Sequence, residues 1–178
     1  MRNARAFRTI LFFLLVTSSY AWSQAPSMPK PSWQQLQFLV GTWSSAGPTQ
    51  LGEGHGEFSF ERELNGYILV RRSFAEYKSG PAAGSRHDDL MIVHADAANA
   101  SPHAIYFDSE GHVIRYNISF PAANAAVFES DTAQPGPRFR LSYALDGKIL
   151  KGKFEVAPPG ADYKTYLSWQ AERTQQPK

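Results

Sequence analysis

The stretch FLVGTWSSAG, residues 38–47, marks a change of pattern in this chain. A hydrophobic run stops at Gly41, Trp43 follows one residue later, and small and polar residues come next. The preceding segment SWQQLQFL, residues 32–39, has a possible capping residue in Ser32 and apolar residues at rough helical spacing. The sequence therefore predicts a short helix followed, from Gly41 onward, by strands and turns.

Hairpin signals recur through the rest of the chain. Asn65-Gly66 lies between the β-rich runs of GEFSFERELNGYILVRRSFAEY, and Asp146-Gly147 lies between those of RFRLSYALDGKILKGKFEV. Such pairs favour a type I′ turn, because both central residues of that turn need positive φ. In AIYFDSEGHVIRYNISF, Gly111 can take the left-handed position of a longer turn.

These hairpins, with the runs DDLMIVHAD, NAAVFESD and TYLSWQAER, amount to roughly ten short strands joined in sequence. Consecutive hairpins make an antiparallel meander, and closure into a barrel removes its two exposed edges. The predicted fold is all-β: an up-and-down barrel with the short N-terminal helix closing one end. A β-sandwich is the alternative.

A helix followed by Gly-x-Trp at the first strand resembles the calycin superfamily, which includes lipocalins, fatty-acid-binding proteins and nitrobindin-like bacterial domains. The resemblance implies that Gly41 lets the chain turn into the barrel and that Trp43 plugs the closed end. It also implies that Arg173, near the end of the last strand, packs across the indole. A guanidinium over an indole face contributes roughly 0.5–2 kcal/mol.

The first 25 residues have the pattern of a secretory signal peptide. Arg2, Arg5 and Arg8 precede the apolar run TILFFLLV, and small residues follow, with cleavage after Ser23 or Ala25. The apolar run is shorter than the roughly 20 residues of a membrane span. The chain has no Cys, which excludes disulfides and a lipid anchor on cysteine. We expect an exported protein with a proline-rich leader at 26–31 and one barrel domain at 32–175.

The predicted cleavage changes the charge of the chain. The whole chain has 18 Lys and Arg against 16 Asp and Glu, and removing three arginines leaves 15 against 16. No basic run remains that could follow a phosphate backbone, so we expect no nucleic acid partner. We also expect no membrane span after cleavage, and the sequence leaves the oligomeric state open.

A meander alternates its connections between two ends, so one set of loops should frame an open mouth. Three histidines, His55, His87 and His112, fall at that end, near Asp89 and Asp108, with Asp88 and Glu110 close by in sequence. Such side chains could bind a divalent metal or act as an acid/base pair, or they could form a solvated rim. The loops assigned to the mouth are 44–54, 78–87, 108–111, 131–137 and 157–163.

The barrel interior is the other candidate site. Arg71 and Arg72 are adjacent in one strand, so one of them must point inward. An inward arginine could pair with an acidic ligand or with an internal glutamate such as Glu61 or Glu63. The predicted ligand-binding residues are Arg71, Arg72, Arg115 and Tyr116.

Three functions remain open at this point. The first is an exported barrel that binds a small apolar or amphipathic, possibly acidic, molecule; a cavity above roughly 300 Å³ favours it. The second is a metal-dependent or acid/base enzyme using the rim, and the third is a filled barrel that binds an envelope protein. Haem is disfavoured, because nitrobindin-like barrels take their axial histidine late in the chain and here no His follows His112.

Overall fold

The computed structural model describes residues 28–96, 101–131 and 136–175. The predicted signal peptide and the first residues of the proline-rich leader lie outside these ranges. Among the described residues, none of the helical segments has the length and apolarity needed to cross a membrane. The elements are η1 (Gln34–Leu39), β1 (Gly41–Thr49), β2 (Gly52–Glu63), η2 (Leu64–Gly66), β3 (Ile68–Tyr77), β4 (Arg86–His94), β5 (His103–Asp108), β6 (Val113–Ala122), β7 (Ala125–Ser130), β8 (Arg138–Asp146), β9 (Ile149–Ala157) and β10 (Lys164–Gln175).

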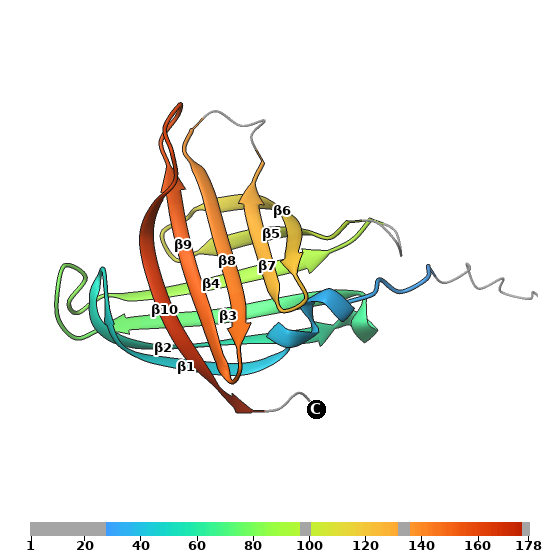
Figure 1. The fold of residues 1–178 in the computed structure, drawn as a ribbon, viewed down its shortest axis with the longest axis horizontal. Helices are drawn as coiled ribbons and strands as arrows, with labels where there is room; N and C mark the ends of the chain where they lie inside the picture. The colour runs from blue at the N-terminus through green and yellow to red at the C-terminus, as the bar shows by residue number, and fades with distance from the viewer. Residues whose placement is uncertain (1–27, 97–100, 132–135, 176–178) are drawn as a thin grey trace, which may run out of the picture.

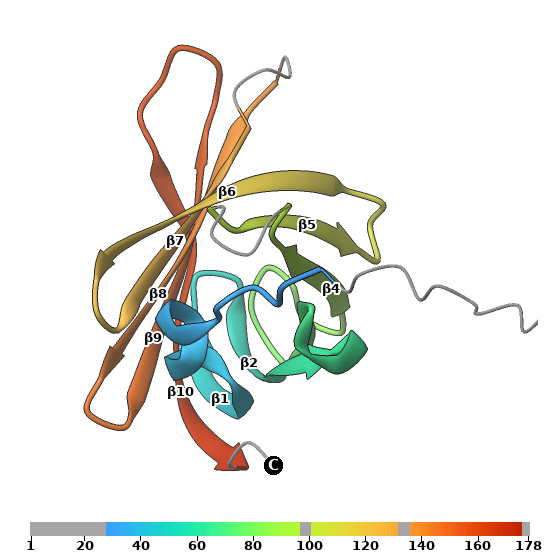
Figure 2. The ribbon, with the colours of Figure 1, turned by 90° about the vertical axis from the view of Figure 1, so that its right-hand side faces the viewer.

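The ten strands form a closed antiparallel barrel in which each strand pairs with its neighbours in sequence and β10 pairs with β1. The predicted all-β meander barrel is confirmed. Strands β7–β10 cross steeply in front of β1–β4 (Figure 1), and η1 lies across the end of the barrel that faces the viewer in Figure 2. Because connections alternate, η1, η2 and the β8–β9 turn share this closed end, and the β1–β2, β3–β4 and β5–β6 turns share the mouth.

Alternation along each strand places one set of side chains inside the barrel. On β2, Phe58 and Phe60 are buried, whereas the residues between and beside them are more exposed. Tyr143 on β8 contacts both rings, at 5.9 Å between centroids in each case. These aromatic contacts fill the half of the barrel next to the closed end and leave the mouth half less densely packed.

The predicted N-terminal helix is wrong in type. Residues Gln34–Leu39 form a 3-10 helix, and its N-cap is Trp33, without a side-chain cap, not Ser32. A six-residue segment suits the tighter 3-10 form, in which positions i and i+3 share a face. Leu36 and Leu39 have this spacing and are both buried.

Two of the predicted turns differ from type I′. Between Glu63 and Ile68 the loop has four residues, with positive φ at Leu64, Asn65 and Gly66. The β8–β9 turn pairs Asp146 with Ile149, so its central residues are 147 and 148, and only the glycine has positive φ. The dipeptides located the hairpins, but the pairing of the flanking strands set the loop length.

The expected loop at 44–54 is also wrong, because β1 and β2 continue through most of it. The glycines of this segment allow the backbone of β3 and of the β3–β4 connection to pack closely against it. A Cβ at Gly52 would lie 1.7 Å from the Ser79 carbonyl oxygen, and one at Gly54 would lie 2.3 Å from that of Glu76. The β3–β4 connection docks on this hairpin through backbone bonds such as Lys78 N–H to the Glu53 carbonyl, 2.8 Å.

Candidate functional site

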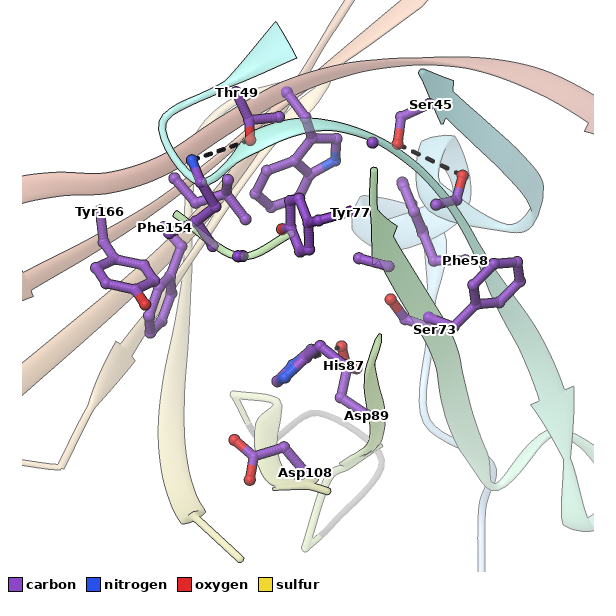
Figure 3. A pocket seen from close by; sticks show the side chains of 18 of the residues that line it. Ser45, Thr49, Phe58, Ser73, Tyr77, His87, Asp89, Asp108, Phe154 and Tyr166 are labelled. Carbon is purple, nitrogen blue, oxygen red and sulfur yellow. Dashed lines mark hydrogen bonds and ion pairs between the residues drawn. The ribbon is translucent and has the colours of Figure 1, made fainter. Parts of the chain in front are cut away.

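A pocket of about 670 Å³ opens at the mouth of the barrel. We define its polar wall as the side chains from β3–β5 and the β5–β6 turn, namely Arg71, Ser73, His87, Asp89, Tyr106, Asp108, Glu110 and His112. The apolar wall comes from β8–β10, with Phe139, Leu141, Phe154, Val156, Leu167 and Trp169. Figure 3 shows His87, Asp89 and Asp108 gathered on one side, away from Phe154 and Tyr166. The pocket is therefore amphipathic.

The opposite end of the barrel is closed by Trp43. Its register partner across the β1–β10 seam is Arg173, whose guanidinium lies 4.1 Å from the indole ring. The indole N–H donates to the Leu39 carbonyl at 2.8 Å, and Arg173 donates to the carbonyls of Phe38, at 2.9 Å, and Val40. Gly41, expected to turn the chain into the barrel, has φ of 118°, so it turns η1 into β1 at low steric cost.

Arg71 and Asp89 form an ion pair within the pocket wall. Each side chain is 6% exposed, Arg71 Nη1 donates to Asp89 Oδ1, and Nη2 donates to Ser73 Oγ at 3.0 Å. Burial lowers the pKa of Arg71, but the Asp89 carboxylate and two nearby tyrosines more than offset this and leave it above its ordinary value. Arg71 Nε is buried and has no hydrogen-bond partner among the described residues.

His87 links the pocket wall to the mouth. Its Nδ1 lies 2.8 Å from Glu110 Oε2, and its Nε2 lies 3.0 Å from the Tyr106 hydroxyl and 3.7 Å from Asp89 Oδ2. Burial, helped by the Asp89 charge, raises the pKa of Tyr106 above its usual range. The Tyr106 hydroxyl therefore stays protonated and can donate a hydrogen bond.

Asp108 is a second carboxylate on this wall, paired directly with Asp89 in the β4–β5 register. Its side chain is 5% exposed, Oδ1 accepts the backbone N–H groups of Glu110 and His112, and Oδ2 lies 2.9 Å from His112 Nδ1. Burial raises the pKa of Asp108, but hydrogen bonds from His112, with the charges of His112 and His87, outweigh it and lower the pKa overall. Asp108 is therefore ionised at neutral pH.

The structure does not bring all the proposed site residues together. Arg72 pairs with Glu63 on the outer face of β3, and Arg115 is exposed on the outer face of β6; neither lines the pocket. Tyr116 is buried and lines the pocket, and burial raises its pKa. His55 is on the opposite face of β2 from the inward Phe58 and reaches only the rim of the pocket. Its Nε2 lies 3.5 Å from Glu76 Oε2, and it is not part of the cluster of His87, Asp108 and Glu110.

Sequence reasoning missed two members of the polar wall. Tyr106 lies two positions before Asp108 on β5, so alternation alone would have placed both on one face. Ser73 has the same relation to Arg71 on β3. One atom each from His87, Asp108 and Glu110 lies within 4.8 Å of the others, a spacing compatible with a shared metal ion.

The chain matches no family model and no curated protein in comparisons of its sequence with known ones. The closed ten-stranded barrel is compatible with a calycin-like fold. The function of the chain is therefore inferred from the geometry of the pocket.

Proposed function

We propose that this protein binds a small, largely apolar molecule in the mouth half of its barrel. The observation that carries the proposal is the pocket of about 670 Å³, in which a polar wall faces an aromatic and aliphatic one. Ligand pockets typically have volumes of roughly 300–1,000 Å³ and combine apolar linings with a few convergent polar groups. This volume also argues against a filled barrel acting only through its outer surface.

The polar wall favours an uncharged oxygen group on the ligand over an acid. The charge of Arg71 is already offset by Asp89, and Asp108 and Glu110 add negative charge beside it. A ligand carboxylate would lie against this excess of negative charge. A carbonyl or hydroxyl oxygen could instead accept a hydrogen bond from the protonated Tyr106, which lines the pocket.

Two further parts of the proposal concern relationship and location. The ten-stranded meander and the Trp43–Arg173 contact support a distant place in the calycin superfamily. The basic start and the short apolar run of residues 1–25 support export across a membrane. The protein would then bind its ligand outside the cytoplasm.

Fluorescence titration with the neutral dye N-phenylnaphthylamine tests this function. We expect the dye to bind, decanol to displace it, and decanoate to displace it at least tenfold less well. Ala75 lines the pocket on β3, so Ala75→Phe should abolish dye binding. Ala144→Phe is the matched control, because Ala144 is exposed on β8 and outside the pocket lining.

The thermal unfolding of both variants shows that they are folded before binding is compared. Equal dye binding by Ala75→Phe and the wild type would mean that the dye binds elsewhere and would overturn the proposal. Stronger displacement by decanoate than by decanol would retain the pocket but reverse the expected preference for an uncharged group.

A further inference from the structure

We infer that the mouth of the barrel holds a divalent transition-metal site formed by His87, Asp108 and Glu110. This inference does not depend on the proposed small-molecule ligand, because the three residues form the site by themselves. They come from β4, the end of β5 and the turn that follows β5, so the antiparallel β4–β5 pairing brings them together. The ion would lie at the edge of the pocket wall.

The donor geometry supports one shared ion. One atom of each residue lies within 4.8 Å of the other two, and His87 Nδ1 is 2.8 Å from Glu110 Oε2. Metal–ligand distances of roughly 2.0–2.2 Å place tetrahedral donors about 3.4 Å apart, between these two values. Small side-chain adjustments would therefore suffice to surround an ion.

His87 and Asp108 make the kind of hydrogen bonds that commonly orient metal-ligating side chains in proteins. A ligating histidine commonly directs its second ring nitrogen to a carboxylate or another fixed polar group. His87 Nε2 lies 3.0 Å from the Tyr106 hydroxyl and 3.7 Å from Asp89, which is held by the buried Arg71. The Asp108 carboxylate is held in place by backbone N–H groups on Oδ1 and by the imidazole of His112 on Oδ2, which still has a second lone pair.

The donor set indicates the class of metal. One imidazole nitrogen with two carboxylates suits Zn²⁺, Co²⁺ or Mn²⁺, whereas Ca²⁺ and Mg²⁺ prefer oxygen ligands alone. Three protein donors leave at least one coordination position open, as in catalytic zinc sites. Glu110 and His87 line the pocket, so this open position is accessible from it.

Isothermal titration calorimetry of untagged, chelator-treated protein with Zn²⁺ tests the site. We expect one ion per chain, with binding at least tenfold weaker in His87→Gln and in Glu110→Gln. The matched control is His55→Gln, which removes an imidazole of similar exposure from the outer face of β2 and should leave affinity unchanged. Co²⁺ should give visible absorption bands that His87→Gln removes.

Three results of these titrations would overturn the inferred metal site. No heat and no Co²⁺ spectrum with the wild type would overturn the inference, as would unchanged binding by Glu110→Gln. Loss of binding in His55→Gln alone would assign the ion to the outer face and would also overturn it. Glu110 is on an exposed turn, so its variant keeps the test valid if His87→Gln fails to fold.

Discussion

The two ends of the barrel use the same strands for different purposes. At the closed end, Trp43 is 1% exposed, and its indole N–H and the Arg173 guanidinium both donate to backbone carbonyls. At the mouth, the buried Arg71 Nε lacks a partner among the described residues, and the ion pairs of Asp108 and Glu110 within the same part of the chain are with histidines. The comparison indicates that stability is concentrated at one end and chemical reactivity at the other.

Truncation of Trp43 is the strongest test of the closed end. Trp43→Ala should lower the free energy of unfolding by about 3–5 kcal/mol, as large truncations of buried aromatic residues do. Arg173→Ala should cost less, and the two effects should not add, because the residues share one contact. Urea unfolding of both single variants and the double variant measures this. Fully additive losses would show that the contact does not couple them.

Substitutions of Arg71 and Asp89 test whether each of these two buried charges needs the other for stability. Asp89→Ala should lower the free energy of unfolding by about 3 kcal/mol, because it leaves the buried guanidinium without a counter-charge. The double variant Arg71→Met with Asp89→Leu should recover most of that loss in urea unfolding. A double variant no more stable than Asp89→Ala would show that the unpaired guanidinium is not the cause of the loss.

The smallest effect is expected on the outer face near the mouth, at Glu155. Its side chain is 7% exposed, and the hydrogen bond from Arg140 Nε, 2.7 Å, lowers its pKa, with further help from Lys153. A lowered pKa stabilises the fold above the ordinary glutamate pKa of about 4.3, and this stability is lost as pH falls through the folded-state pKa.

Glu155→Gln should therefore cost less than about 1 kcal/mol at pH 7, since both cationic partners are partly exposed. The variant should also lose less stability than the wild type as the pH falls below about 4.3. Thermal unfolding from pH 7 to pH 3 measures both effects. Parallel melting curves across this range would show that the pair contributes nothing to the pH dependence.

Much of the fold could be predicted because strand signals are local. The hairpin dipeptides located the β2–β3 and β8–β9 connections, and period-2 alternation required Arg71 and Arg72 to face opposite sides. Arg71 is indeed buried and Arg72 exposed. The Gly41-x-Trp43 motif pointed to the seam where Trp43 meets Arg173, 130 residues later in the chain.

The predictions made from the sequence were wrong where contacts between distant residues outweigh local conformational preference. Gly52 and Gly54 look like loop residues, yet they lie in a strand because the neighbouring backbone approaches too closely for a side chain. The sequence predicts that His55 lies at the end of a loop at the mouth. It lies instead in β2, which extends further than its composition suggests, and alternation along the strand turns its side chain to the outer face.

The sequence by itself determined the number of strands, their order and which residues alternate, since these depend on turns and on a two-residue period. The tertiary structure decided which inward side chains meet. Barrel closure and strand stagger bring His87, Asp108 and Glu110 within reach of one another and place His55 beside Glu76. Those distances depend on register across several strands, which no single stretch of sequence encodes.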